Sequence, residues 1–470
     1  MSHNNNNTKK LMKPTIILKR VPLLKPSVTM RHYVSRTNTK NTTTNSLYYL
    51  DQMTLLNAED KKDYNLYFKS LPKQQLLSLF LIGLCSINKF TLNTAIRVFP
   101  YIPLSWVKIL VSRLYCGGET MKEVLHCGEQ LQTRGISNMM LSLTIEDSEG
   151  TKHIDNIDEI VSLTIKSLHE VLKPNLVSQL NTTGNVNEIA PGYIALKPSA
   201  LVKNPHEVLS KFDTHPDAKI LIENCKKVTQ EVFNLNQELM KAFPERKVPF
   251  FVSTIDAEKF DLQNEGVYTL QRILMKEFNK KKYNLPSVIG TWQLYLSESM
   301  KHLEKDMELA KKFNYTLGLK IVRGAYIHSE PNRNSIIFNT KEGTDNNYNE
   351  IMLKIINDMV ENGSKSVFSH LVVASHNMDS QLQAANILNS LSPEHYARGN
   401  VTLGQLLGMA DNVAFELVEN NSMKNVIKYV PWGPTKETRD YLLRRLQENG
   451  DAVRSDNGWG LVKRVWSALF

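Results

Sequence analysis

The sequence of 470 residues predicts an α/β protein, a (β/α)8 barrel of the TIM type that follows a helical N-terminal lobe. Two observations lead to this fold class. From about residue 134, eight short apolar and β-prone runs follow one another, and amphipathic helical stretches separate them. Strands that alternate with helices are typical of parallel βα units, and eight such units close a barrel. A doubly wound open sheet is the alternative arrangement.

Residues 58–130 place apolar side chains at helical spacing, and no convincing strand interrupts them. We therefore expect a tail over residues 1–50, a helical lobe over 51–130 and the barrel domain over 131–470. The longest apolar run, LLSLFLIGL from Leu76, is predicted to be a buried helix, because it is shorter than the roughly 20 residues that span a bilayer. Any contact with a membrane is then expected to be peripheral.

The barrel domain is expected to contain eight strands, with helices between them. The predicted strands cover residues 136–143, 192–197, 248–253, 287–292, 317–322, 370–375, 400–405 and 425–430. The best helical candidates between them cover residues 205–241, 266–281, 294–313, 346–361 and 378–389. No G-x-G-x-x-G opens any βα turn, so a Rossmann-type dinucleotide site is not expected.

The net charge of +10 is concentrated in the tail, where residues 1–50 hold nine Lys and Arg and no acidic residue. The rest of the chain holds 48 basic and 47 acidic residues, which argues against a nucleic-acid-binding protein. The tail has the composition of a mitochondrial transit peptide, and Arg31 in RHYVS suggests cleavage after Tyr33. A disordered basic tail that binds an acidic surface is the alternative. The four cysteines form no metal-binding pattern, so no metal site is expected.

Polar residues stand at or just after most of the predicted strands. They are Lys197, Asp256, Gln293, Lys320, Arg323, Tyr326, Ser375, His376, Asn377, Gln405 and Tyr429. Strand ends are often polar because they meet solvent, so each residue alone is weak evidence. In a barrel, however, the carboxyl ends of all strands lie on one face, where active sites form. We therefore expect these side chains to converge on a polar ligand.

Two adjacent arginines, Arg444 and Arg445, lie in a predicted helix that begins at Pro434 or Thr435 and ends at Asn449–Gly450. One interpretation leaves both arginines solvated, with Arg444 paired to Glu448 at helical spacing. The other places the two guanidinium groups over the barrel mouth, where they would bind a carboxylate with parallel hydrogen bonds. The residues themselves leave both interpretations open.

Three motifs make the chain similar to a known family. They are LKIVRGAYIHSE (319–330), VVASHN (372–377) and KYVPWGPTKETRDYLLRRLQENG (428–450). Supporting segments are IALKPSAL (194–201), STIDAE (253–258), GTWQLYL (290–296) and TKEGTDNNY (340–348). On these motifs the chain resembles the proline dehydrogenase family, in its mitochondrial fungal form, over about residues 130–450.

The resemblance implies a flavoenzyme of proline catabolism that binds FAD non-covalently at the strand carboxyl ends. It implies that L-proline is oxidised to Δ1-pyrroline-5-carboxylate by hydride transfer from C5 to flavin N5. Electrons would then pass to ubiquinone, through peripheral contact with the matrix side of the inner mitochondrial membrane. No nucleic acid partner is implied.

The resemblance also implies a role for individual residues. The substrate and its chemistry would be served by Lys197, Asp256, Tyr326, Leu407, Tyr429, Arg444, Arg445 and Glu146, of which Glu146 would pair with a substrate-binding arginine. The flavin would contact Gln293, Lys320, Val322, Gly324, Ala325, Thr340, Lys341, Ser375, His376, Asn377, Gln405 and Glu448. The paired arginines would bind the proline carboxylate.

Two positions depart from the family pattern: Ser142 stands where many members have Asp, and Trp432 replaces a smaller or tyrosyl residue. Neither belongs to the expected arginine pair, so activity is expected to survive. The alternatives are a hydroxyproline dehydrogenase of the same family, a non-catalytic basic binding protein and a catalytically inactive relative. The bulk of Tyr429 beside the substrate ring favours proline over hydroxyproline.

Overall fold

The computed structural model describes residues 67–69, 71–85, 87–145, 156–326, 330, 332–439, 441–443 and 459–469. The chain divides into two compact units, residues 1–44 and 45–470, and all described residues belong to the second unit. The expected transit peptide therefore lies outside the described residues. So do four expected site residues, Glu146, Arg444, Arg445 and Glu448.

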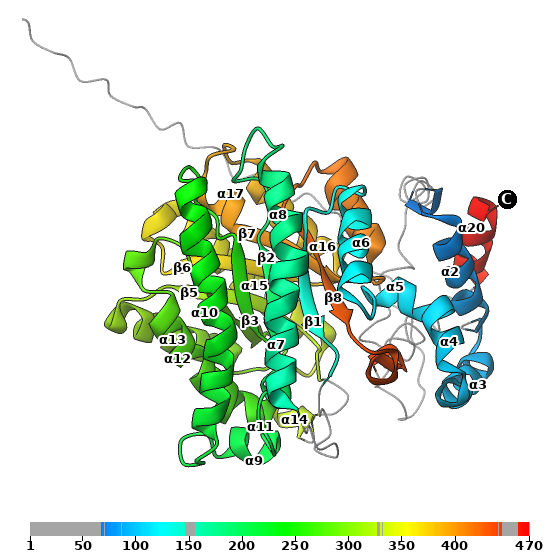
Figure 1. Ribbon diagram of the computed structural model, residues 1–470, viewed down its shortest axis with the longest axis horizontal. Helices are drawn as coiled ribbons and strands as arrows, with labels where there is room; N and C mark the ends of the chain where they lie inside the picture. Colours follow the sequence, from blue (N-terminus) through cyan, green and yellow to red (C-terminus); the bar gives the residue numbers. More distant parts are fainter. Residues whose placement is uncertain are drawn as a thin grey trace, which may run out of the picture. The chain divides into compact units, whose positions relative to one another are not determined.

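Eight parallel strands form a closed barrel in sequence order, with β1 paired to β8 (Figure 1). The strands are β1 (Asn138–Leu143), β2 (Gly192–Leu196), β3 (Phe251–Ile255), β4 (Val288–Gln293), β5 (Leu317–Val322), β6 (Phe368–Ala374), β7 (Val401–Leu406) and β8 (Val426–Trp432). The predicted (β/α)8 barrel is confirmed, and the open sheet is wrong because β8 closes on β1. Each strand begins and ends within three residues of its predicted limits.

The strands consist mainly of apolar residues because both of their faces are buried, one in the barrel interior and the other against the helices. Inside the barrel, Met140, Tyr193, Val252, Ile289 and Ile427 form a packed cluster. The outward-facing residues pack against the surrounding helices in a second, much larger cluster. The barrel interior is therefore a filled core rather than a channel, and in this fold active sites form at the carboxyl ends of the strands.

The helices of the barrel domain follow the strands in the expected alternation (Figure 1). They are α7 (Ile157–Ser167), α8 (Lys173–Leu180), α9 (Pro205–Ser210), α10 (Ala218–Ala242), α11 (Phe260–Leu262), α12 (Tyr268–Phe278), α13 (Ser299–Phe313), α14 (Arg333–Ile336), α15 (Lys341–Asn362), α16 (Met378–Asn389), α17 (Tyr396–Asn400) and α18 (Asp411–Phe415). The helix predicted over 205–241 is two helices, α9 and α10, because residues 211–217 form turns. The helices over 157–180 were not predicted.

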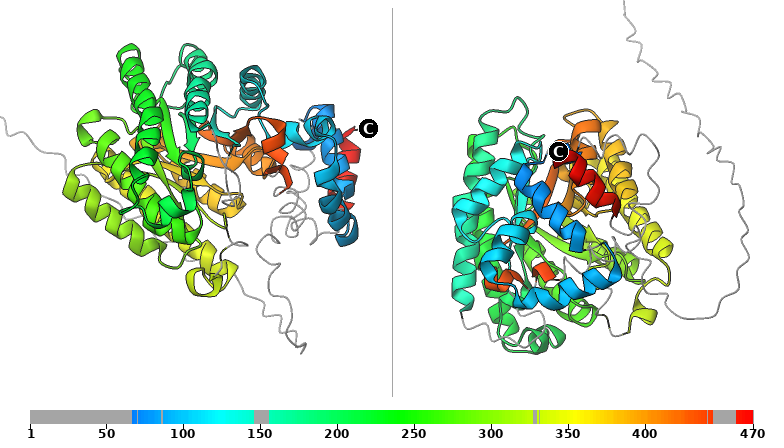
Figure 2. Two further views of the ribbon diagram at one scale, coloured as in Figure 1. Left: turned by 60° about the horizontal axis from the view of Figure 1, so that its bottom comes forward. Right: turned by 90° about the vertical axis from the view of Figure 1, so that its right-hand side faces the viewer.

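The lobe is helical, as predicted, wherever it is described. Its helices are α2 (Lys73–Cys85), α3 (Lys89–Val98), α4 (Leu104–Val107), α5 (Arg113–Tyr115) and α6 (Met121–Gln132). The last helix of the chain, α20 (Trp459–Leu469), lies beside α2, and the two are seen side by side in both views of Figure 2. Val465 of α20 packs in one cluster with Tyr67, Phe68 and Leu76. Both ends of the described chain thus contribute to the lobe.

The prediction that the run from Leu76 is a buried helix is wrong for part of that run. Leu76 is buried, but Leu77 is 51% exposed, and Leu81 and Ile82 line an open apolar groove. The physical reason is that α2 packs against α20 through one side only. Among the described helices, no single one is long and apolar enough to cross a membrane, although residues 75–85 and 90–101 would pass if the bent pair were taken together.

Candidate active site

Three predicted residues meet at the carboxyl ends of strands that are far apart in sequence. Asp256 directly follows β3, Lys320 lies in β5 and Tyr429 lies in β8. Asp256 accepts a hydrogen bond from the Lys320 ammonium and another from the Tyr429 hydroxyl, the latter at 2.7 Å. The ammonium also lies 5.3 Å from the centre of the Tyr429 ring. A buried cation and a buried anion therefore compensate each other at the mouth of the barrel.

Strand alternation explains why these three side chains point to the same place. Side chains two residues apart share a face of a strand, so Tyr429 lies on the same face as Ile427 in the barrel interior. Asp256 is four residues after the interior residue Val252, so alternation places it on the same face. Lys320 is paired across the sheet with Val372, another interior residue. The polar cluster is thus the top layer of the apolar barrel core.

The loop after β5 is held against the loop after β3. Gly324 turns the chain with a left-handed φ of 77°, which a residue without Cβ adopts at no steric cost. Tyr326 then donates a hydrogen bond to the Ala257 carbonyl at 3.0 Å. Glu330 accepts from the Phe260 amide at 3.0 Å, and burial raises the pKa of the Glu330 carboxyl. These contacts fix the wall of the site beside Asp256.

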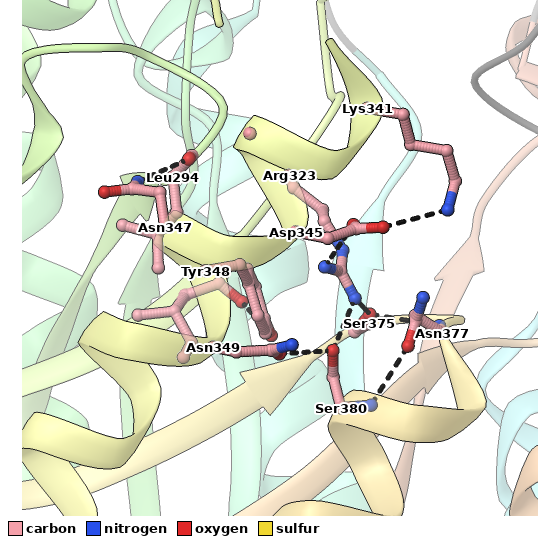
Figure 3. Close-up of polar contacts among 12 residues, drawn as sticks. Leu294, Arg323, Lys341, Asp345, Asn347, Tyr348, Asn349, Ser375, Asn377 and Ser380 are labelled. Atoms are coloured by element: carbon pink, nitrogen blue, oxygen red, sulfur yellow. Dashed lines mark hydrogen bonds and ion pairs between the residues drawn. The ribbon is translucent and has the colours of Figure 1, made fainter. Parts of the chain in front are cut away.

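A cationic cluster lies at the neighbouring edge of the mouth (Figure 3). Arg323 donates hydrogen bonds to Asp345 at 2.6 Å, to Ser375 at 2.9 Å and to Ser380 at 2.8 Å. Its guanidinium lies 4.2 Å from the centre of the Tyr348 ring. Lys341 contacts the other oxygen of Asp345 at 2.8 Å. Two cations share one carboxylate here, so the cluster has a net positive charge.

Two helices begin beside this cationic cluster. The Thr340 hydroxyl accepts from the Gly343 amide at 3.0 Å and caps α15, while the Asn377 side chain accepts from the Ser380 amide at 3.0 Å and caps α16. Arg323 joins the two helices near their N-termini, because it bonds to Asp345 of α15 and Ser380 of α16. Helix N-termini and arginine both favour anions, so this edge suits a phosphate-bearing group.

Strands β6 and β7 end in polar groups that meet each other. His376 accepts a hydrogen bond from the Leu406 amide at 3.2 Å, and Leu407 donates from its own amide to the Tyr429 carbonyl at 2.9 Å. Gln405 is buried, and neither atom of its side-chain amide has a hydrogen-bond partner among the described residues. A buried amide without partners is costly, and a bound polar ligand would relieve that cost.

The other predicted residues lie on the same face. Lys197 follows β2, Val322 ends β5, Ala325 follows Gly324, and Gln293 ends β4. The Gln293 amide donates to the Glu258 carbonyl at 2.6 Å and accepts from the Tyr295 hydroxyl at 2.8 Å, so it braces the loops after β3 and β4. The helix that was expected to carry the two arginines is described over residues 435–439 and 441–443, and it begins at Thr435.

Several residues of the site were not assigned a role from the sequence. Arg323 was recognised as a polar residue after a strand but was given no function, and Asp345 and Glu330 were missed. The signal for Asp345 was its position four residues after Lys341 on a helix. Glu119 was also missed, although it accepts from the amide of Thr435 at 2.8 Å. Nothing in the local sequence indicates that contact, because the partners are 316 residues apart.

Comparison with known proteins agrees with this architecture. Residues 125–457 match the family described as Proline dehydrogenase. The chain is 28% identical to mitochondrial proline dehydrogenase 1 of Dictyostelium discoideum, over 88% of this chain and 76% of that protein. It is 26% identical to hydroxyproline dehydrogenase of Bos taurus, over 72% of this chain and 76% of that protein.

A solved structure shares the fold. It is proline utilization A from Bdellovibrio bacteriovorus inactivated by N-propargylglycine, with a TM-score of 0.56 and 17% identity over 84% of this chain. The match spans 37% of that longer chain. The fold and the site define an α/β barrel with polar and charged side chains at the carboxyl ends of its strands. The family match covers most of the sequence, and this chain belongs to the proline dehydrogenase family.

Proposed function

We propose that this protein oxidises L-proline to Δ1-pyrroline-5-carboxylate with FAD as its cofactor. The observation that carries the proposal is the cluster of Asp256, Lys320 and Tyr429 at the strand ends, next to the cationic edge around Arg323. One ligand bound across this mouth would meet a polar reaction centre and a phosphate-binding edge together. Family membership supplies the substrate class.

The residues present suit FAD on two counts. Arg323, Lys341 and the first turns of α15 and α16 would hold its diphosphate, because they bring two cations and two helix N-termini to one edge. The unpartnered amide of Gln405 would gain hydrogen bonds from a polar ring system. When bound, FAD supplies the hydride acceptor that no protein side chain provides.

The chain's own residues would orient the substrate and keep water away. Asp256 fixes the Lys320 ammonium and the Tyr429 hydroxyl in place, so their positions are set before substrate binds. Lys320 would stabilise negative charge that develops in its vicinity. Arg444 and Arg445 are proposed to bind the proline carboxylate, and Glu146 and Glu448 to support them. These four assignments stay predictions, because the residues lie outside the described ranges.

We further propose that the protein acts on the matrix side of the inner mitochondrial membrane and passes electrons to ubiquinone. Two observations support a mitochondrial location. The relative from Dictyostelium discoideum is named as mitochondrial, and the tail over residues 1–50 has the composition of a transit peptide.

Hydroxyproline oxidation is the second candidate, since relatives with that name are similar over a comparable length. The specific residue that favours proline is Tyr429. Its hydroxyl donates a hydrogen bond to Asp256 at 2.7 Å, which would hold the ring beside the proposed substrate. The aromatic bulk would restrict the space that a ring hydroxyl needs.

The absorption spectrum of the purified full chain with FAD, before and after anaerobic addition of L-proline, tests the proposal. We expect a yellow protein whose flavin absorbance bleaches with proline. A protein that takes up no FAD, or a bound flavin that proline never reduces, would contradict it.

Arg444→Met and Arg445→Met form a second arm of the same experiment. Each variant should stay yellow but require about ten- to a hundredfold more proline to bleach, since a hydrogen bond between charged groups is worth about 1.5–3 kcal/mol. Bleaching at the wild-type proline concentration would show that these arginines do not bind the carboxylate. The same titration with hydroxyproline distinguishes the two candidate substrates.

A further inference from the structure

An apolar groove of about 520 Å³ opens between α2, α3 and α4 of the lobe. Its lining is almost entirely apolar and includes Leu81, Cys85, Phe90, Val98 and Trp106. At its inner end it meets Tyr115 and Leu442, which pack in one cluster with Met409, two residues after Leu407 of the barrel mouth. The groove is therefore a neighbour of the candidate active site, and none of the described site residues lines it.

The rim of the groove carries large side chains that are exposed to solvent. Phe90 and Trp106, which line the groove, are 79% and 61% exposed. Tyr101 does not line the groove, but it stands directly before the lining residue Ile102 and is 85% exposed. Contiguous exposed apolar surface of this kind marks an interaction site. Tryptophan and tyrosine are also the residues that favour the boundary between water and lipid, because their rings are apolar and their polar atoms remain hydrated.

The positive charge of the lobe favours an anionic partner. Residues 67–118 contain six Lys and Arg and no Asp or Glu. Lys73 and Arg97 are exposed, whereas Lys108 is paired with Glu119 at 2.5 Å. A second copy of this chain would bring an equally basic face to the groove, and like charges would oppose the contact. An anionic surface with an apolar interior complements both the charge and the aromatic rim.

We propose that the groove face of α2, α3 and α4 docks on the surface of an anionic lipid bilayer. Phe90, Tyr101 and Trp106 enter the interfacial layer, while Lys73 and Arg97 contact the phosphate headgroups. The contact is peripheral. It rests on the proposed function in one respect only, namely that the electron acceptor is dissolved in the membrane. Docking through this face would bring the neighbouring barrel mouth close to that acceptor.

Vesicle co-sedimentation of the full chain tests the docking. Wild type is compared with the double variant Phe90→Ser, Trp106→Ser, and with a matched control, Ile220→Ser, Phe313→Ser, which removes exposed apolar side chains from α10 and α13. We expect binding to anionic vesicles to fall by at least about tenfold in the lobe variant and to stay unchanged in the control. The reversal Lys73→Glu, Arg97→Glu should weaken binding by at least about fivefold per residue at low salt and little at high salt.

The basic tail of residues 1–50 is identical in all variants, so differences among them report on the lobe. Quenching of Trp106 by brominated lipid, taken as the difference between wild type and Trp106→Phe, shows whether the groove itself enters the bilayer. Wild-type binding that the lobe variant retains, or absence of that quenching, would overturn the proposal. So would a dimer in sedimentation velocity that only the lobe variant dissociates, since a second copy would then cover the groove.

Proline oxidation with a soluble dye acceptor is measured alongside. We expect equal dye-linked rates in wild type and in the lobe variant, because neither substituted residue belongs to the active site. Failure of the dye-linked reaction would count against the proposed function, whereas failure of vesicle binding would count against the docking alone.

Discussion

Asp256 accepts hydrogen bonds from two side chains that arrive from different strands, Lys320 from β5 and Tyr429 from β8. Each of the three side chains is held in place by its contact with another. Without Asp256, a buried ammonium would have lost its counter-ion, and without Tyr429 the carboxylate would lose a 2.7 Å hydrogen bond. The cluster therefore works as one unit, and substitutions within it are expected to be non-additive.

Tyr429 gives the prediction at this scale. Tyr429→Phe keeps the ring but removes the hydroxyl that donates to Asp256, so we expect proline oxidation to slow by about tenfold while proline remains preferred to hydroxyproline. Tyr429→Ser removes the ring and should shift the kcat/KM ratio of the two substrates toward hydroxyproline. Steady-state kinetics with both substrates measure this. An unchanged ratio in Tyr429→Ser would show that the ring does not contact the substrate.

The helix that begins at Thr435 is anchored from a distant segment. Glu119 accepts from both the amide and the hydroxyl of Thr435 with one oxygen, and from Lys108 at 2.5 Å with the other. A carboxylate at a helix N-terminus is also favoured by the helix dipole. Glu119 therefore fixes the start of the helix that is described up to residue 443, directly before Arg444 and Arg445 in the sequence.

Glu119→Ala is expected to lower the free energy of unfolding by about 1–3 kcal/mol, because it removes hydrogen bonds to a charged group. The substitution should also raise KM for proline more than it lowers kcat, since it loosens the helix that begins at Thr435 and with it the chain before Arg444. Glu129→Ala, which removes an exposed carboxylate from α6, is the matched control. Denaturation curves and kinetics measure both effects. Equal effects of the two variants would contradict the anchoring role.

The same contact predicts a pH dependence of stability. The hydrogen bonds from Lys108 and Thr435 lower the pKa of Glu119 below its ordinary value of 4.5. A carboxyl whose pKa is lower in the folded state stabilises the fold above its unfolded pKa and loses that effect as pH falls through the folded pKa. The stability difference between wild type and Glu119→Ala should therefore be full near neutral pH and shrink below about pH 4.5.

A group of three charges, of which Lys428 is fully buried and Asp411 and Arg134 are partly buried, joins parts of the molecule that are far apart in sequence. Lys428 of β8 lies 2.6 Å from Asp411 of α18, and Arg134, just after α6, lies 3.3 Å from the same carboxylate. Burial lowers the pKa of Lys428, and Asp411 offsets this only in part. Burial alone would raise the pKa of Asp411, but the two cations outweigh it and lower that pKa. The barrel wall, α18 and α6 are thereby tied together directly behind Tyr429.

Lys428→Met should destabilise the whole fold by about 3 kcal/mol, near the low end for a broken buried ion pair, because Arg134 still compensates Asp411. Combined replacement by Lys428→Met and Asp411→Leu should cost less than the sum of the two single changes. Lys424→Met, which breaks the exposed pair with Glu188, should cost at most about 1 kcal/mol. Chemical denaturation checks all three. Additive costs would show that the charges are not coupled.

The sequence by itself determined the barrel. All eight strands are short, mainly apolar runs, a local pattern that is typical of barrel strands because both of their faces are buried. It also determined which polar residues stand at the strand ends, because that depends only on where each run stops. Helix boundaries were predicted less accurately: one helix was expected where α9 and α10 lie, since a turn between two amphipathic helices leaves a weaker local signal.

Only the tertiary structure decided which of those polar residues touch. The contacts of Asp256 with Lys320 and Tyr429, of Glu119 with Thr435 and of Asp411 with Lys428 join residues whose separation in sequence gives no local signal. The exposure of α2 was decided in the same way: its composition predicts burial, but α20 covers only one side of it. Local periodicity reports the conformation of a segment, whereas the partner of each surface is set by how the segments assemble.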